Sequence, residues 1–405
     1  MIKSDSQANM NNSIDNTIAS NVKIPNIRQK TSLFMHEQNI EGYNILEPRA
    51  KLKAEILPLE MELFELMNLE YGKDVVTEDV LLVNDLDNTN NNYYVHLVRN
   101  GIFDPNKENF LLLHGFLSSW THYIIMLPYL LKKYNVLIPD NIGMGLSSRP
   151  KVNFTSAQQC QDYFIEVLYI LIKKLFLKGT YNIKKDFYIG GHSLGGFIVS
   201  RYILKYPIGI KKVFLMSPAG ITDWRIPGTD IHREMGCVKG CCMDVVTSCL
   251  WPFQTRMQNL YRCCCLSDMV LNNLGTYNYD FDIENIKRMP DGSEFKLNKE
   301  RIYEILKQLI KISLDYPDDI YQCVYYIFHL PPPAAIIPVE LEIYRRCMFQ
   351  IIFAFGEVDW MDRTGALRLE QRDPNRFKVY TVSKSGHSFS LENPKEVQML
   401  LDEYF

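Results

Sequence analysis

The stretch Phe187-Tyr188-Ile189-Gly190-Gly191-His192-Ser193-Leu194-Gly195-Gly196 sets a serine among glycines, directly after a short apolar run. Its middle, Gly191 to Gly195, fits the pattern G-x-S-x-G, in which a sharp strand-to-helix turn holds the serine in a strained backbone conformation. A chance pentapeptide in a glycine-containing loop would look the same, but here an apolar strand precedes the serine and a helical pattern follows it. The stretch therefore predicts Ser193 as a nucleophile on a tight turn.

Apolar runs of strand length alternate with helical patterns on both sides of this turn. They lie at residues 110–113, 134–139, 187–189, 212–216, 349–355 and 377–382. Helical patterns follow at residues 120–133, after the capping pair Thr155-Ser156, after Ser193, at 367–372 and from Pro394. This alternation predicts an α/β fold, with a mostly parallel central sheet and helices on both faces.

The chain divides into four segments by pattern. Residues 1–50 are polar and predict a disordered tail, followed by a short amphipathic helix near Leu57 to Leu69. Residues 51–220 and 348–405 form the two parts of the α/β core, in which β-like stretches at 74–83 and 93–98 flank an Asn-rich hairpin loop at 88–92. Residues 221–347 lack the alternation, and they predict a mainly helical cap inserted after the sixth strand.

Composition limits the possible functions and locations. The chain has 405 residues and a formal net charge of −3, so it offers no basic field for nucleic-acid binding. No apolar run reaches the length of about 20 residues that spans a bilayer. The N-terminus lacks a signal-peptide pattern and has no glycine at position 2. We expect an intracellular, cytoplasmic protein.

Most of the ten cysteines fall in the predicted cap, at positions 237, 241, 242, 249 and 263–265. A zinc site is disfavoured, because the spacing is not a paired C-x2-C pattern and no histidine is interleaved. S-acylation is favoured over zinc, since apolar residues surround the cluster. Buried or half-buried free thiols are the leading interpretation in a reducing compartment.

Candidates for the acid and the base lie near the C-terminus. Asp359 follows the apolar strand at 351–355, and the carboxyl ends of parallel strands are where active sites of open sheets gather. Asp362, three residues later, is an alternative acid. His387 follows the last strand, and the order Ser193, Asp359, His387 is that of the α/β-hydrolase fold. The alternative is that His387 is an ordinary surface histidine.

An oxyanion hole needs two backbone N–H donors near the serine. The N–H of Leu194 is one candidate, and that of Phe116, in the turn His114-Gly115-Phe116 after the third core strand, is the other. We interpret His114 as a residue that braces this turn. His192 is expected to support the site from behind, with its side chain directed away from the tip of the turn.

Further motifs resemble a particular family. Residues 140–150, DNIGMGLSSRP, are similar to the D-x-x-G-x-G-x-S-S-R-P element of the α/β-hydrolase-domain 4/5 family, and residues 356–362, GEVDWMD, resemble the G-D-x-D-W-M-D stretch of its cardiolipin-specific deacylases. Met216 to Gly220 and Trp120 also fit. The family includes lysophospholipases and a lipid-droplet lipase coactivator. The resemblance covers roughly residues 100–220 and 345–400.

The resemblance implies a phospholipid or lysophospholipid acyl ester as substrate. We expect no cofactor and no metal. The family's H-x4-D element, associated with lysophosphatidic acid acyltransferase activity, reads here from His387 to Glu392, with glutamate in place of aspartate. This departure weakens the acyltransferase alternative. A third alternative, a non-enzymatic lipid-surface adaptor that binds a lipase or a lipid-droplet protein, is disfavoured because Ser193 is present.

Apolar and cationic residues lie together in the predicted cap. Trp251 and Phe253, near Arg256 and Arg262, would suit shallow docking to an anionic lipid surface. Ordinary cap core is an equally good interpretation, since aromatic residues at helical spacing are usually buried. If the docking interpretation holds, the protein associates peripherally with membranes or lipid droplets.

Overall fold

The computed structural model describes residues 46–82, 93–177, 181, 184–223, 225–226, 297–316, 319–329 and 334–405. Most of the predicted tail, the Asn-rich loop, the seven clustered cysteines and the docking candidates Trp251 and Phe253 lie outside these ranges. The three cysteines within them, Cys160, Cys323 and Cys347, are buried free thiols.

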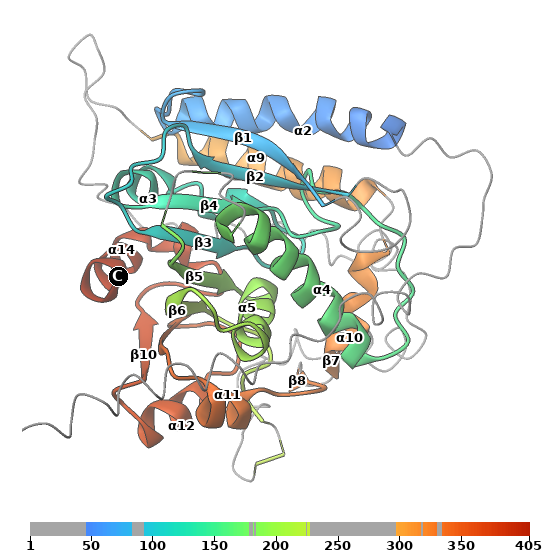
Figure 1. Cartoon of the computed structure of the whole chain (residues 1–405). Helices are drawn as coiled ribbons and strands as arrows, with labels where there is room; N and C mark the ends of the chain where they lie inside the picture. Colours follow the sequence, from blue (N-terminus) through green and yellow to red (C-terminus); the bar gives the residue numbers. More distant parts are fainter. Residues whose placement is uncertain are drawn as a thin grey trace, which may run out of the picture.

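The core is one eight-stranded sheet with the order β1-β2-β4-β3-β5-β6-β9-β10 (Figure 1). The five neighbouring pairs from β4 to β10 are parallel, while β1 and β2, and β2 and β4, pair antiparallel. The mostly parallel sheet is therefore confirmed. The strands are β1 (Val75–Leu81), β2 (Tyr94–Asn100), β3 (Asn109–Leu113), β4 (Asn135–Pro139), β5 (Phe187–His192), β6 (Ile210–Met216), β9 (Gln350–Gly356) and β10 (Phe377–Val382).

Helices cover both faces of this sheet, as predicted. Alternate residues of β3 belong to two separate apolar clusters, Leu111 and Leu113 to one and Phe110 and Leu112 to the other, because successive side chains of a strand point to opposite faces. The first cluster contains apolar residues of α4 (Ala157–Ile172) and α5 (Leu194–Lys205). The second contains those of α2 (Leu46–Leu66), α3 (Leu127–Lys133), α9 (Lys299–Asp315) and α14 (Pro394–Tyr404).

The N-terminal helix differs from the prediction. Helix α2 starts at Leu46, so residues 46–50 of the predicted tail are helical, and it is 21 residues long with Pro58 inside it. Sequence patterns usually place a helix boundary at such a proline. Here burial of Leu52, Ile56 and Leu63 holds the helix against the second apolar cluster.

The segment predicted as one helix at 120–133 is also different. It forms a short 3-10 helix, η3 (Trp120–Tyr123), and then α3, which begins next to Pro128. Elsewhere the predicted boundaries agree to within a few residues, and Ser156 caps α4 by accepting the N–H of Gln159. No helix of the described residues is both long enough and apolar enough to cross a membrane.

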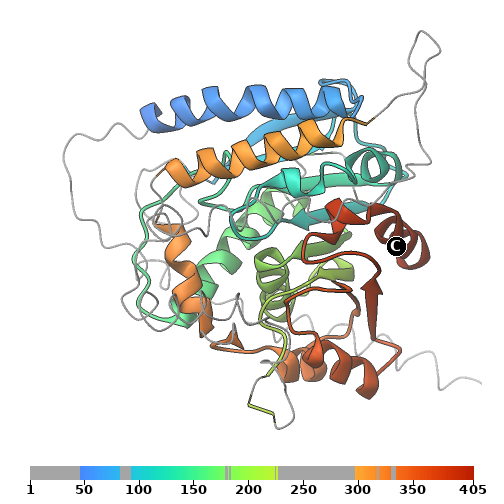
Figure 2. The same ribbon diagram turned by 180° about the vertical axis from the view of Figure 1, so that it is seen from behind.

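The described part of the predicted cap is mostly helical. It contains α9, the 3-10 helix η6 (Ile320–Gln322), α10 (Cys323–Ile327), a hairpin of β7 (Phe328–His329) with β8 (Ala334–Ala335), and α11 (Glu340–Arg346). Helix α9 lies alongside α2 in both views (Figures 1 and 2). Helix α11 packs instead against α5 and α12 (Thr364–Arg372) of the core.

Candidate active site

Ser193 lies at the turn between β5 and α5, in a strained conformation. Its φ of 52° and ψ of −113° fall where a residue with a Cβ rarely lies, at a cost of about 1–3 kcal/mol. Hydrogen bonds hold this backbone in place: the Ser193 N–H donates to Met216 O at 2.9 Å, and the Ala219 N–H donates to Ser193 O at 3.1 Å. The turn that the sequence predicts is therefore present.

Gly195 allows the serine turn to approach the end of β3. A Cβ at Gly195 would lie 2.4 Å from Leu113 O and 2.6 Å from His114 O, which no side chain can do without moving the backbone. This contact brings the start of α5 against the turn that follows β3. The predicted oxyanion turn and the serine are thus neighbours in space.

The turn at Gly115 lies directly against Ser193. A Cβ at Gly115 would come within 3.1 Å of the Ser193 Cβ and 2.9 Å of His192 Nδ1. Within the ranges the structure describes, the N–H groups of Phe116 and Leu194 donate to no protein group. Two free backbone donors beside a serine are the arrangement that can bind a developing oxyanion.

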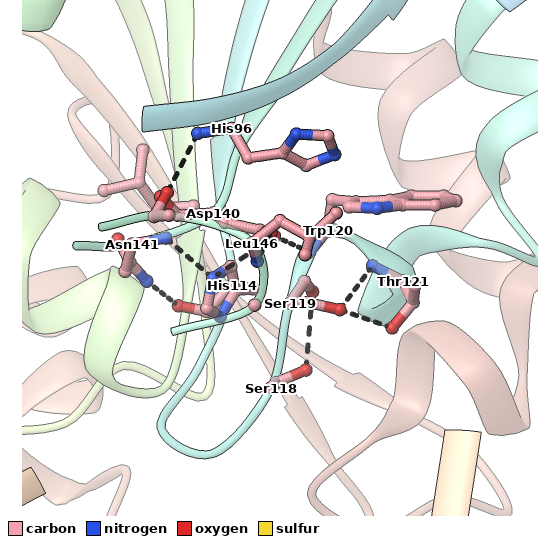
Figure 3. A network of polar contacts seen from close by, with 12 residues as sticks. His96, His114, Ser118, Ser119, Trp120, Thr121, Asp140, Asn141 and Leu146 are labelled. Carbon is pink, nitrogen blue, oxygen red and sulfur yellow. Dashed lines mark hydrogen bonds and ion pairs between the residues drawn. The ribbon is translucent and has the colours of Figure 1, made fainter. Parts of the chain in front are cut away.

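His114 is hydrogen-bonded within this turn and to the loop after β4 (Figure 3). Its Nδ1–H donates to Gly115 O at 2.7 Å, and its Nε2 accepts the Asn141 N–H at 2.8 Å. The Asn141 side-chain amide donates to His114 O, also at 2.8 Å. Complete burial lowers the pKa of His114 to about 4, against the opposing effect of the Gly115 carbonyl. His114 is therefore neutral and structural.

Asp140 anchors the same region from behind. Its carboxylate accepts the N–H of Trp120 at 2.7 Å and that of Leu146 at 2.9 Å (Figure 3). One bond reaches the segment after the oxyanion turn, and the other closes the loop of residues 140–150. The D-x-x-G-x-G segment therefore has a structural role, because it fixes the oxyanion turn against the sheet.

His387 and Asp359 are paired. The His387 Nδ1–H donates to Asp359 Oδ1 at 2.8 Å. The same carboxylate accepts the Met361 N–H at 3.0 Å and the Ser217 hydroxyl. Burial raises the pKa of Asp359, but the His387 imidazole and these hydrogen bonds outweigh burial and hold the pKa below its usual value. A buried, ionised carboxylate of this kind fixes the tautomer of an imidazole and stabilises its protonated form.

Asp362, the alternative acid, is used elsewhere. Its Oδ1 accepts the N–H and the hydroxyl of Thr364, at 2.9 and 2.6 Å, at the start of α12. The structure pairs His387 with Asp359 and not with Asp362.

Two buried groups hold the loop that carries His387. Glu392 Oε2 accepts the Gly386 N–H at 2.5 Å, and His192 Nε2–H donates to His387 O at 2.8 Å. Burial raises the pKa of Glu392, more than the Gly386 N–H and His387 lower it. Burial and the neighbouring histidines lower the pKa of His192 well below its usual value. A neutral His192 therefore joins the serine turn to the loop that carries His387.

His122 was not predicted as a site residue from the sequence. Its ring stacks on His192 with 4.0 Å between centroids, and its Nε2 is hydrogen-bonded to Ser390 Oγ at 2.8 Å. Ser390 lies in α13 (Phe389–Glu392), directly after His387. Complete burial lowers the pKa of His122 to about 3. No local motif marks this residue, because its partners lie about 70 and 270 positions away.

The structure thus brings the serine turn and the His387–Asp359 pair to one place. His192, adjacent to Ser193 in the chain, touches His387 through both its hydrogen bond and a ring distance of 4.6 Å. Within the described residues no hydrogen bond joins Ser193 Oγ to the imidazole. Catalytic hydrogen bonds of this type commonly tighten only when substrate binds.

One buried cluster has the donor types of a metal site. Glu60, His96 and Asp140 each place a ligand atom within 4.8 Å of the others. His96 lies 3.3 Å from Glu60 and 3.3 Å from Asp79. Burial lowers the pKa of His96, but these carboxylates raise it to about 10. An imidazolium between carboxylates therefore supplies the positive charge here, behind the oxyanion turn.

Comparisons with known proteins agree with this architecture. The family model described as "alpha/beta hydrolase fold" matches residues 108–236. A "Probable 1-acylglycerol-3-phosphate O-acyltransferase" of Oryza sativa subsp. japonica is 22% identical over 292 residues, which are 72% of this chain and 65% of that protein. "Lipase 1" of Psychrobacter immobilis is 31% identical over 121 residues, 30% of this chain and 34% of the lipase.

The similarity to solved structures covers more of the chain. The carboxylesterase CesB of Bacillus subtilis superimposes with a TM-score of 0.54 at 14% identity, over 88% of this chain and 98% of the esterase. At such low identity the match supports the fold alone. Part of the sequence is thus similar to a protein named as an acyltransferase and to a lipase, and the fold is shared with an esterase.

Proposed function

Because this chain has the α/β-hydrolase fold, we propose that it is a serine carboxylic-ester hydrolase acting on acyl esters of phospholipids or lysophospholipids. The observation that carries the proposal is the strained Ser193, at φ 52°, joined through His192 to a buried His387–Asp359 pair. The substrate class rests on the family resemblance of residues 140–150 and 356–362. Relatives named as a lipase and as acyltransferases of a glycerol phosphate support it.

The proposed reaction proceeds in two steps. Ser193 Oγ attacks the ester carbonyl carbon while its proton passes to His387 Nε2, and the N–H groups of Leu194 and Phe116 donate to the oxyanion. The imidazolium then gives its proton to the leaving alcohol oxygen as the C–O bond breaks. A water molecule, deprotonated by His387, releases the fatty acid from the acyl-enzyme and restores the serine.

The reaction is tested with a panel of phospholipids and lysophospholipids in mixed micelles. We expect wild-type protein to release fatty acid from at least one lipid and Ser193→Ala to lose that release. Ser200→Ala is a matched control, because Ser200 is buried in the helix that follows Ser193 and, among the described residues, its hydroxyl donates only to Phe197 O. Equal release by wild type and Ser193→Ala would refute the proposal.

An acyltransferase is the second candidate, because the rice relative carries that name. The same acyl-enzyme could pass its acyl group to the hydroxyl of a lysophosphatidic acid instead of to water. The test adds acyl-CoA and lysophosphatidic acid to the assay and compares phosphatidic acid formed with fatty acid released. Transfer that exceeds hydrolysis would favour this second candidate over the first.

We also propose a place of action for the protein. A lipid substrate requires the protein to work at a membrane or lipid-droplet surface, and a lipase or lipid-droplet protein could be its partner there. Co-sedimentation with liposomes of anionic lipid, compared with Trp251→Ala and Phe253→Ala, tests the docking candidates. Unchanged liposome binding by both variants would show that neither Trp251 nor Phe253 docks the protein to lipid.

A further inference from the structure

Trp360 is an exposed aromatic residue beside the base. Its indole lies 4.7 Å from the His387 ring, centroid to centroid, with an interplanar angle of 43°. The residue is 54% exposed, although an indole carries one of the largest apolar surfaces of any side chain. Among the residues that the structure describes, neither core packing nor a hydrogen bond of the indole explains its position.

The imidazole of His387 therefore has two ring neighbours of different character. His192 is buried and neutral, and Trp360 is half-exposed and has an electron-rich face. In the described part of the chain, the titratable groups that interact with His387 are the Asp359 and Glu392 carboxylates and the buried histidines His122 and His192. Both histidines are held neutral by burial, so neither opposes a positive charge on His387.

We propose that Trp360 is a positioning residue for His387, whose indole face holds the imidazole in place and stabilises the imidazolium that forms during catalysis. The attraction between a cation and an aromatic ring acts within about 6 Å of the ring centroid and is strongest for tryptophan. Asp359 binds the Nδ1 side of the imidazole, and Trp360 contacts the ring itself. This inference rests on the proposed role of His387 as base.

The contact itself is tested without any substrate. A protonated histidine quenches the fluorescence of a tryptophan it touches, and the chain has four tryptophans, so wild type minus Trp360→Phe isolates the Trp360 signal. We expect this difference signal to fall when the imidazole is protonated at acid pH. The response should persist in Ser193→Ala and vanish in His387→Gln. A flat difference signal in wild type would overturn the proposal.

The effect on catalysis is tested with a p-nitrophenyl ester. Trp360→Leu keeps an apolar cover but removes the aromatic face, so we expect kcat/KM to fall about two- to tenfold and its pH profile to differ from that of wild type. Trp360→Phe should fall between Leu and wild type. Val358→Ala is the matched control, since Val358 is 55% exposed in the same loop. Identical profiles for Trp360→Leu and Val358→Ala would overturn the proposal.

The two tests separate this inference from the proposed function. Should Ser193→Ala hydrolyse esters as wild type does while the fluorescence titration persists, the nucleophile would be wrong and the Trp360–His387 contact would stand. Should Ser193 prove essential while the fluorescence signal is flat, the function would stand and the role of Trp360 would fail. Circular dichroism of each variant controls for folding, which a half-exposed side chain is not expected to govern.

Discussion

At the scale of single residues, the site depends on the carboxylate that holds the imidazole. Asp359 bonds to His387, and Asp362 bonds to Thr364. Asp359→Asn keeps the shape but presents an amide where His387 Nδ1–H needs an acceptor. We expect kcat to fall about 10³–10⁴-fold, the loss typical of a triad that loses its carboxylate.

Asp362→Asn is the matched control for this prediction. An asparagine oxygen can still accept the Thr364 N–H, so both kcat and Tm should stay close to wild type. Steady-state kinetics on a soluble ester measure both variants. A larger loss of kcat in Asp362→Asn than in Asp359→Asn would show that Asp359 is not the acid.

His192 offers a second prediction at this scale. His192→Leu leaves His387 O without its donor, which costs about 1–3 kcal/mol for a buried carbonyl, and we expect kcat to fall by one to two orders of magnitude. His192→Gln can present an amide N–H near the position of Nε2, and it should recover most of that loss. Equal activity of the two variants would show that the hydrogen bond does not position His387.

Only some of the residues of the site could be predicted from the sequence. Ser193, Asp359 and His387 could be chosen because each follows a recognisable strand and their order is known for this fold. The bracing of the base loop by His122 and Ser390 could not, since it joins residues 268 positions apart. Trp360 was visible as part of a motif, but only its ring contact with His387 gives it a role.

At the scale of elements, the docking of α2 depends on a buried charge cluster. Arg49 and Glu60 of α2 reach Asp79 and His96, respectively, on β1 and β2, and Glu60 also accepts the Trp120 indole N–H at 2.6 Å. Because the backbone N–H of Trp120 donates to Asp140, this cluster also borders the oxyanion turn (Figure 3). Attachment of α2 is thus coupled to the back of the site.

The pKa of His96 makes this attachment pH-dependent. Its folded-state pKa of about 10 lies above the ordinary value of 6.5, so its stabilising contribution is complete below about pH 6.5 and is lost as the pH rises through about 10. Urea unfolding of wild type and His96→Gln tests this. We expect the stability advantage of wild type to shrink from pH 6.5 toward 10, and an advantage that grows instead would contradict the assignment.

Strands were easier to predict than helices. The apolar runs of β3, β5, β6 and β9 are short and mostly buried, so their pattern leaves little choice. The start of α2 and the break between η3 and α3 depend on tertiary burial around Pro58 and Pro128. Proline marks a boundary in a sequence, but packing decides whether a helix continues through it.

At the scale of the whole molecule, distant segments converge on the loop that carries the base. Helix α9 binds α2 through a two-pronged ion pair, Arg301 to Glu62 at 2.6 and 2.8 Å. Tyr303 of the same helix donates its hydroxyl to Leu391 O in α13 at 3.3 Å. The segment inserted after β6 therefore contacts both the N-terminal helix and the element that follows His387.

The central claim is that this assembly activates Ser193 as a nucleophile. Its most direct measurement is mass spectrometry of the protein after reaction with a fluorophosphonate probe. We predict one adduct per chain, on the peptide that contains Ser193, with no adduct in Ser193→Ala and much slower labelling in His387→Gln. An unlabelled wild-type protein, or labelling unchanged in Ser193→Ala, would contradict the account.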